Sequence, residues 1–330
     1  MALPRARLMG LLRLGIALVI LAAVGWAVAR NWTAVSADLG KVSGWALVMA
    51  LLLAVVGPIL TMLGWRVLLA DLGSPLHVAP AGGIFFIGQL GKYLPGSVWS
   101  VLAQAEMGAK LHIPRRRSAV VGLISIGLGV LTGLLVGVAA LPLLLRTSGS
   151  GHVGWLVLAL PLLVVACWPR LLNRLIALGL RLLHREPLEH ELSGRAVLTS
   201  VVLFVGAWLC FGVHVWVLAA SIGGATGATS LALASVAGYA LAASLGMLAV
   251  IAPAGVGIRE ALLVLMLGQA MPTSAATAVV LLSRFIITAG DVLVAGGGWL
   301  YARSHHLLSA HPGHGAPAAP DPVTHEEGRP

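Results

Sequence analysis

A glycine-rich turn beside an Arg–Glu pair is the strongest candidate in this chain for ligand chemistry. The stretch PAGVGIRE, residues 253–260, places Gly255 and Gly257 just before Arg259 and Glu260. Glycines let a ligand approach the backbone, the first amides of a helix point outward, and an arginine adds a fixed positive charge. These parts predict an anion-binding turn that a phosphate would fit. The alternative is that Arg259 and Glu260 only neutralise each other within the fold.

A second ionisable pair, Arg284 and Asp291, lies in a later apolar segment. The two residues are seven positions apart, so on an α-helix they share one face. Two arginines with one or two carboxylates leave positive charge in excess, and this makes anion binding as well supported as neutralisation. We therefore place both pairs in one candidate substrate-binding site.

A third polar group lies in the stretch GQLGKYLPGSVWSVLAQAE, residues 88–106. Its polar members are Gln89, Lys92, Tyr93, Gln104 and Glu106. Gln89, Lys92 and Tyr93 join the candidate substrate-binding residues, because polar side chains in short glycine-broken segments suit a binding pathway. Lysine and tyrosine also serve as interfacial anchors in membrane proteins, and the sequence does not choose between these roles.

The composition determines the solvent in which these residues must work. Of the 330 residues 59% are hydrophobic and 10% are charged, against roughly 25% charged in ordinary soluble domains. The net charge of +10 arises from basic residues at the ends of apolar runs, which is the positive-inside pattern of membrane proteins and not a nucleic-acid-binding stripe. The sequence therefore predicts an all-α polytopic protein of the cell membrane, without a nucleic-acid partner.

Apolar segments long enough to cross a bilayer are broken by two proline- and glycine-rich regions. We predict six full spans: 14–29, 44–70, 118–145, 152–169, 196–222 and 273–302. The first could instead be a signal peptide, but an uncleaved span is favoured because more spans follow. Residues 75–113 and 229–271 are predicted as re-entrant hairpins of short helices. A hydropathy count gives eight or more segments, since 229–252 is long enough to cross by itself.

The two halves of the chain show a weak internal repeat. Pro95 and Pro114 are 19 residues apart, as are Pro253 and Pro272, and Ser125 meets Ser283 at the same offset. Paired segments broken by proline and glycine point to a transporter-type binding site. With the arginine and lysine distribution, the repeat predicts two inverted halves and cytoplasmic termini.

The remaining segments are predicted from their composition. Residues 1–303 form the transmembrane domain, and its segment 170–195 has arginines at helical spacing beside leucines, which predicts an amphipathic helix on the cytoplasmic membrane surface. The tail 304–330 is rich in Pro, Gly and His and is predicted to be disordered. Its histidines could chelate a metal, but their loose spacing favours a solvated tail. We expect no cofactor, no metal centre and no enzyme motif.

The stretches quoted above resemble the two signature regions of the lysylphosphatidylglycerol synthase transmembrane-region family. The second is the more specific, and its residues here are Pro253, Gly255, Gly257, Arg259, Glu260, Arg284 and Asp291. The resemblance implies a flippase-like role for an anionic or aminoacylated phospholipid, or for a lipid-linked intermediate. The soluble aminoacyl-transferase domain of the synthases is not expected in this chain, and synthase activity is therefore not expected either. Ser125-Ile126 stands where many relatives carry a charged pair, which leaves the first half less polar.

These observations support three hypotheses. The leading one is a lipid translocator that binds headgroups through Arg259 and Arg284. The alternative is a non-transporting membrane partner that docks a glycosyltransferase or cell-envelope enzyme on its basic cytoplasmic surface. The third is a membrane-embedded transferase that uses Glu260 or Asp291.

Overall fold

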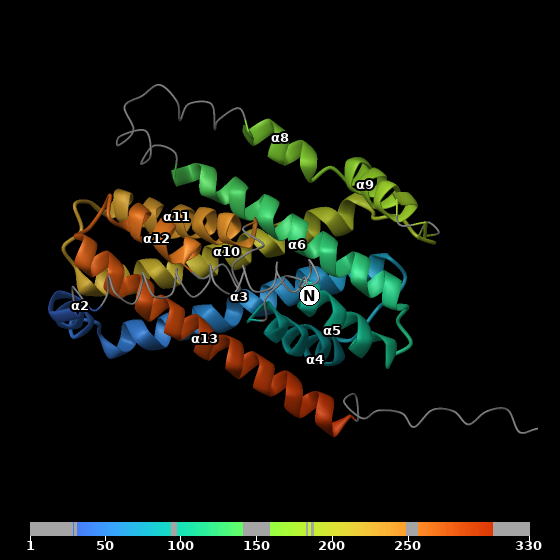
Figure 1. Ribbon diagram of the computed structural model, residues 1–330, viewed down its shortest axis with the longest axis horizontal. Helices are drawn as coiled ribbons and strands as arrows, with labels where there is room; N and C mark the ends of the chain where they lie inside the picture. The colour runs from blue at the N-terminus through green and yellow to red at the C-terminus, as the bar shows by residue number, and fades with distance from the viewer. Residues whose placement is uncertain are drawn as a thin grey trace, which may run out of the picture.

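The computed structural model describes residues 29, 32–93, 98–140, 159–182, 184–185, 188–248 and 257–305, and the elements in these ranges are helices (Figure 1). They are α2 (Trp32–Leu39), α3 (Gly44–Asp71), α4 (Val78–Gln89), η1 (Leu90–Tyr93), α5 (Val98–Ala109), α6 (Arg115–Gly137), η2 (Val138–Ala140), α8 (Ala159–Ala166), α9 (Pro169–Leu182), α10 (Gly194–Ile222), α11 (Ala228–Leu248), α12 (Ile258–Leu267) and α13 (Thr273–Ser304). The all-α prediction is confirmed for these ranges.

Five helices of the described ranges are long and apolar enough to cross a membrane: α3, α6 with η2, α10, α11 and α13. Four of them coincide with predicted spans. The fifth, α11, covers most of the segment 229–252, which was noted as long enough to cross by itself although the preferred prediction placed it in a re-entrant hairpin. Its Ala- and Leu-rich sequence has no helix breaker before Pro253, so it continues for 21 residues. The predicted span 14–29 lies outside the described residues, and of 152–169 only α8 and its C-terminal flank are described.

The starts of the long helices follow from local sequence. Ser43 and Ser193 stand before α3 and α10, and each side chain accepts a hydrogen bond from a backbone amide three residues later, at 3.2 Å. Pro114 and Pro272 stand before α6 and α13. Proline fits such a position because it loses no helical hydrogen bond there.

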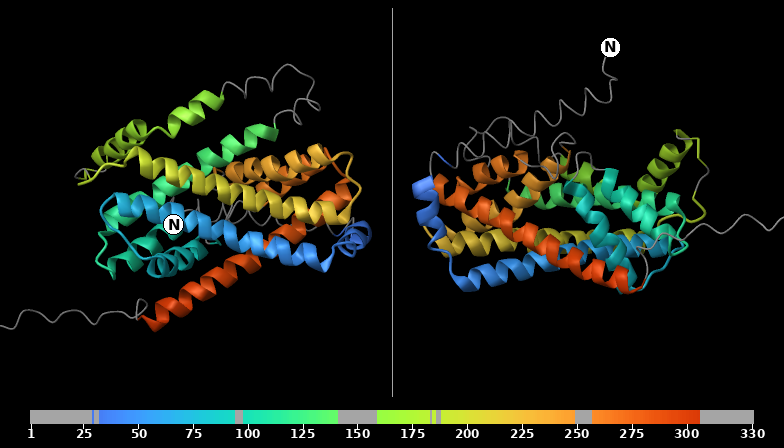
Figure 2. Two further views of the ribbon diagram at one scale, coloured as in Figure 1. Left: turned by 180° about the vertical axis from the view of Figure 1, so that it is seen from behind. Right: turned by 60° about the horizontal axis from the view of Figure 1, so that its bottom comes forward.

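Helices α3 and α10 run antiparallel and pack along each other from end to end (Figures 1 and 2). At one end the Ser43 amide donates to Ser221 Oγ at 2.8 Å. At the other end the Ser193 amide and hydroxyl donate to the Asp71 carboxylate at 2.7 and 2.8 Å. The pair is therefore held at both ends.

Glycines allow α3 and α10 to approach each other closely. A Cβ built at Gly57 would lie 2.6 Å from the ring of Phe211, and one at Gly64 would overlap the ring of Phe204. Phe204 and Phe211 are seven residues apart on α10, as are the two glycines on α3, so each ring packs over one glycine. The Ser200 hydroxyl also donates to the Gly64 carbonyl at 3.0 Å.

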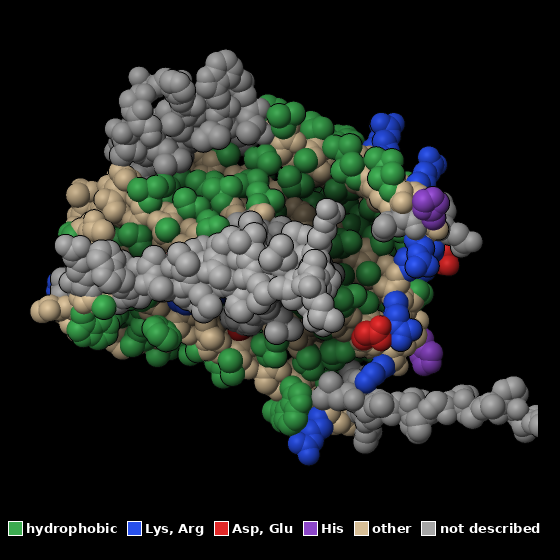
Figure 3. All heavy atoms as spheres, viewed as in Figure 1, with side chains coloured by type: hydrophobic (Ala, Val, Ile, Leu, Met, Phe, Trp, Pro, Cys, Tyr) green, Lys and Arg blue, Asp and Glu red, His purple; other side chains and the backbone are tan. Residues whose placement is uncertain are grey.

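The end of the bundle where α3 finishes and where α6 and α10 begin is called the basic end. Figure 3 shows Lys and Arg side chains gathered there. Arg117 at the start of α6 donates to Gly73 O and Ser74 Oγ beyond the end of α3, at 3.0 and 2.7 Å. Arg66 near the end of α3 donates to Leu76 O at 2.6 Å. Hydrogen bonds from Arg66 and Arg117 thus hold the connection between α3 and α4 at this end.

The segment α4–η1–α5 is a hairpin that begins and finishes at the basic end. α4 follows the Gly73–Leu76 connection held by Arg117 and Arg66, and α5 finishes beside the start of α6, where Arg115 pairs with Glu106 at 2.8 Å. Its tip, η1, reaches α13. The segment α11–α12 begins and finishes at the opposite end, where the Thr226 amide donates to Ala270 O at 2.9 Å.

The predicted amphipathic segment 170–195 contains α9 and then an irregular stretch leading to α10. Leu172 and Ile176 of α9 pack against the core, whereas Arg170, Arg174 and Arg181 are exposed. Asn173 holds the irregular stretch by two hydrogen bonds of 3.0 Å with the backbone of Leu192. The amphipathic helix is confirmed over residues 169–182.

Candidate functional site

Glu260 is the central carboxylate of the candidate site. Its Oε1 accepts hydrogen bonds from Arg259 Nε and Nη2 at 3.2 and 2.9 Å and from Arg284 Nη1 at 3.4 Å. Its Oε2 accepts the amide of Gly257 at 2.6 Å. The Glu260 side chain is 12% exposed, so these partners replace water around the charge. Two predicted arginines therefore meet at one buried carboxylate.

The turn before α12 differs from the predicted anion-binding turn. Gly257 has a φ of +88°, a left-handed conformation that favours glycine, and it is the N-cap of α12. Its amide is occupied by Glu260, the third residue of the same helix, in the manner of a capping box. This amide is therefore not offered to an anion, and the arginines are the groups that carry the positive charge. Gly255 lies outside the described residues.

Lys92 and Asp291 form the second part of the site. Lys92 Nζ lies 2.7 Å from Asp291 Oδ2, and the exposed fractions of the two side chains are 35% and 7%. Lys92 belongs to the tip η1 and Asp291 to α13, so the contact joins the first hairpin to the last helix. This pairing favours a role within the bundle for Lys92 over the interfacial anchor considered from the sequence.

The other sequence-selected residues are distributed unevenly around this site. Gln89 is the last residue of α4, three positions before Lys92, and is half-buried. Tyr93 ends η1, and its side chain lies outside the described part of the structure. Glu106 does not join the site, because it pairs with Arg115 at the basic end and both side chains are about two-thirds exposed.

The five residues Lys92, Arg259, Glu260, Arg284 and Asp291 are called the ionic cluster. Arg284 and Asp291 are two helical turns apart on α13, about 10.5 Å along its axis. Both stand more than ten residues from either end of this 32-residue helix, so the cluster lies near mid-bundle. Three cationic side chains and two carboxylates give it one net positive charge.

Three residues that the sequence analysis did not select for binding adjoin the cluster. Arg259 lies over the ring of Tyr239 in α11, with 5.9 Å from the guanidinium carbon to the ring centroid. His214 meets the same ring edge-on, at 5.5 Å between centroids. Its Nδ1 is bonded to the carbonyl of Phe211, so its Nε2 accepts from Ser283 Oγ at 2.8 Å.

His214 is a packed histidine, because it is fully buried and both ring nitrogens have partners. The sequence signal for Tyr239 was an isolated aromatic residue among the small residues of α11. Ser283 was noted for the repeat, and its position beside Arg284 placed it near the cluster.

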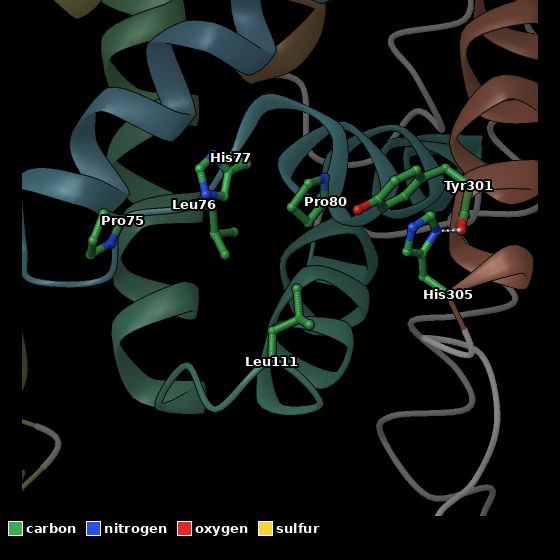
Figure 4. A pocket seen from close by; sticks show the side chains of 7 residues that line it. All are labelled: Pro75, Leu76, His77, Pro80, Leu111, Tyr301 and His305. Atoms are coloured by element: carbon green, nitrogen blue, oxygen red, sulfur yellow. Dashed lines mark hydrogen bonds between the residues drawn. The ribbon is translucent and has the colours of Figure 1, made fainter.

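Two surface cavities lie outside the cluster. One, of about 370 Å³, is at the basic end, where Tyr301 and His305 of α13 face His77, Pro80 and neighbouring residues (Figure 4). The rings of Tyr301 and His305 stack there at 4.1 Å. The other, of about 460 Å³, is a largely apolar groove along the outer face of the first hairpin, lined by Leu90, Gly91, Trp99, Leu102, Ala103 and Glu106. In the described ranges no group of three or more metal-ligating side chains is gathered.

A bundle of long apolar helices with an ionic cluster near its centre defines a polytopic helical membrane protein. The chain belongs to the lysylphosphatidylglycerol synthase TM region family, whose model matches residues 11–295. The resemblance found in the sequence is therefore confirmed. A comparison with curated proteins finds no match.

Proposed function

We propose that this protein translocates a lipid with an anionic or aminoacylated headgroup, or a related lipid-linked intermediate, and that the ionic cluster binds the headgroup. The observation that carries the proposal is the excess positive charge of a mostly buried cluster in the middle of membrane-spanning helices. Ionisable groups at this depth are costly and mark substrate pathways. Membership of a family named for the membrane region of a phospholipid synthase supports a lipid substrate.

The cluster suits a headgroup that exchanges ion pairs. A phosphate that approaches Arg259 and Arg284 competes with Glu260, and both guanidinium groups can form paired hydrogen bonds with its oxygens. An amino group on the headgroup competes with Lys92 for Asp291. Each exchange replaces one buried pair by another, so no charge has to be buried without a partner.

Two inverted halves with re-entrant hairpins form part of the proposal. The segments 43–71 and 193–221 match at an offset of 150: a capping serine begins each, and its backbone amide bonds the last residue of the other. Packing is reciprocal too, because α4 lies on α13 and α11 lies on α6. The two hairpins return to opposite ends of the bundle. The basic end is assigned to the cytoplasm by its positive charge.

The test is a lipid-scrambling assay with purified protein in proteoliposomes. Fluorescent phosphatidylglycerol and phosphatidylcholine are compared, and the wild type is expected to move the anionic lipid faster. The Arg259→Gln and Arg284→Gln variants should each move the anionic lipid at least about ten times more slowly than the wild type. The reason is that the loss of one interaction of about 1.4 kcal/mol corresponds to a factor of ten in rate. Arg115→Gln is the matched control, because its ion pair is exposed at the basic end.

An equal rate for wild type and the two arginine variants, at equal folding, would remove the cluster from the mechanism. The proposal is for a translocator and not an enzyme. Formation of a modified lipid by the purified chain would overturn that part.

The docking of a peripheral enzyme at the basic end is the second candidate, favoured by α9. Arg174 and Arg181 are exposed there, whereas Arg117 is largely buried and bonded to Gly73, Ser74 and Glu189. The test is co-purification of cell-envelope enzymes with the wild type and with an Arg174→Gln/Arg181→Gln variant. Loss of a partner with unchanged lipid movement would support docking in addition to transport.

A further inference from the structure

Buried polar atoms without protein partners lie between α5 and α6. Gln104 of α5 and Ser118 and Ser125 of α6 are 3%, 0% and 8% exposed. No described residue hydrogen-bonds to Gln104 Oε1 or to the hydroxyl of either serine. These three residues are called the polar seam.

The members of the polar seam form one row that starts at the basic end. Ser118 and Ser125 share a face of α6 and are about 10.5 Å apart along its axis. Gln104 stands between them, because its Oε1 would lie 3.4 Å from a Cβ built at Gly122. Ser118 is in the first turn of α6, next to the arginines of the basic end.

The inner end of the row is set by Thr132, the next hydroxyl on this face of α6. Its Oγ1 bonds the carbonyl of Leu128 at 2.7 Å and receives the Trp208 indole N–H at 3.2 Å. This hydroxyl has protein partners, in contrast to Ser118 and Ser125. The polar seam therefore ends between Ser125 and Thr132, and beyond Thr132 a further buried hydroxyl without a protein partner in the described ranges, that of Ser244, lies beside Gly133.

A buried polar atom without a partner costs about 1–3 kcal/mol, and ordered water normally removes this cost in folded proteins. We propose that the polar seam binds a file of water molecules and forms a hydrated path from the basic end into the bundle. Its groups are a neutral amide and two hydroxyls, without a carboxylate, and arginines stand at its mouth. This chemistry takes neutral water in preference to a cation.

The polar seam leads toward the first hairpin tip. The Gln104 side chain also packs on Gly88 of α4, where a Cβ would lie 2.6 Å from Gln104 Cγ. Gly88 is four residues before Lys92, so water at Gln104 stands about one helical turn from the lysine of the ionic cluster. The path gives this side of the bundle a solvent connection to the basic end. It does not depend on whether the protein moves lipids.

The first test is radiolytic hydroxyl-radical labelling of the wild-type protein in detergent or nanodiscs, because radicals formed from bound water modify neighbouring side chains. Val101 and Val130 are matched, being 4% and 8% exposed. Val101 lies 3.2 Å from the Cβ position of Gly122 in the seam, whereas Val130 is five residues beyond Ser125 and turned well away from it. Val101 should be labelled at least about fivefold faster. Equal labelling, or faster labelling of Val130, would overturn the proposal.

The second test uses thiol chemistry in a Cys167→Ala/Cys210→Ala background. Hydrogen peroxide is neutral, little larger than water, and oxidises thiolates, which require hydration. The Ser125→Cys variant should be oxidised at least about tenfold faster than Val130→Cys, although the native residues are both 8% exposed. Equal rates would contradict a hydrated seam. If either variant fails to fold, the labelling of the wild-type valines decides the question.

Discussion

The α5–α6 region and the α12–α13 region have the same architecture and different chemistry. Each is a short helix, a connection that ends in proline, and a long helix that begins after that proline. In α12–α13 the polar residues are ionic and pair with each other around Glu260. In α5–α6 the ionic residues stay at the basic end, and the buried polar residues are the neutral groups of the polar seam. The same arrangement of helices therefore carries the ionic cluster in one half and the uncharged polar seam in the other.

The repeat offset of 158 locates where the two regions diverge. Ser125 matches Ser283, but Ile126 stands where the second half has Arg284, and Gly133 where it has Asp291. Asp291 contacts the first hairpin through a salt bridge with Lys92. At Gly133 the missing side chain instead allows close approach of Ser244 of α11 and of the Trp208 ring of α10. An ion pair can exchange partners with a ligand, and close packing on a glycine cannot. Under the proposed function, we therefore expect α13, and not α6, to respond to the headgroup.

The largest effect is expected for Glu260→Gln. It removes the carboxylate that two buried arginines share, and should lower the free energy of unfolding by about 3–5 kcal/mol. Thermal unfolding in detergent measures it, with Glu106→Gln as the exposed control, for which a much smaller effect is expected because its ion pair is solvated. Equal effects of the two variants would show that the ionic cluster is solvated like the surface pair.

Gly133→Ala tests the packed counterpart in the first half. The new methyl group would overlap Ser244 Oγ and lie 2.7 Å from the Trp208 ring, so a loss of about 1–3 kcal/mol is expected. Gly127→Ala on the same helix meets nothing within 4 Å and should be neutral or stabilising by up to about 1 kcal/mol. Thermal unfolding of both variants checks the contrast, and equal tolerance would refute close packing at Gly133.

Asp291→Asn tests whether the ion pair serves binding or only stability. Because Lys92 is one-third exposed and water can partly solvate it, the expected cost is about 1–2 kcal/mol, with a clear loss of lipid movement. Adding Lys92→Met should restore part of the stability without restoring transport. Restored transport in the double variant would mean that this pair is purely structural.

Ser283→Ala and Ser125→Ala compare the matched serines directly. Ser283 donates to the buried His214, so its loss should cost about 1–2 kcal/mol. Ser125 has no protein partner among the described residues, and its loss should cost less than about 0.5 kcal/mol if water takes over the site. A reversed order in thermal unfolding would contradict the assignment of partners.

The smallest effect concerns Asp38 in α2, which serves as a reference outside the compared regions. The hydrogen bond from Lys41 holds the pKa of the Asp38 carboxyl below its usual range. Its contribution, below about 1 kcal/mol, is present above the unfolded pKa of about 4 and is lost as the pH falls through the lower folded pKa. In the Asp38→Asn variant, the free energy of unfolding should therefore fall less between about pH 4 and lower pH than it does in the wild type. An unchanged pH profile would rule out the contribution.

Much of the fold could be predicted because it depends on local sequence. Uncharged apolar runs gave four long helices, and the serines and prolines at their starts act within one turn. The length of α11 was recognised only in the hydropathy count, because the proline- and glycine-rich break near Pro253 favoured a hairpin of short helices.

The candidate site was predicted in its residues and only partly in its contacts. Arg259 and Glu260 are neighbours, so their pairing was foreseen as an alternative. The contact of Lys92 with Asp291 depends on the packing of η1 against α13, which no local pattern contains. The polar seam was missed because Ser118 and Gln104 differ from ordinary polar residues only in their burial.

The fastening of α3 to α10 at both ends has a mechanical consequence. Hydrogen bonds at Ser43 and at Ser193, with interlocked glycines and phenylalanines between them, fix α3 and α10 to each other along their length. The first hairpin is joined to α3 through the connection that Arg117 bonds, whereas α11 packs along the middle of α10, where Val236 lies against Gly212. For the proposed translocation we therefore expect the first hairpin to move relative to this fixed pair of helices. Spin labels on α3 and α10 should then keep a constant separation while labels on η1 and α13 move apart.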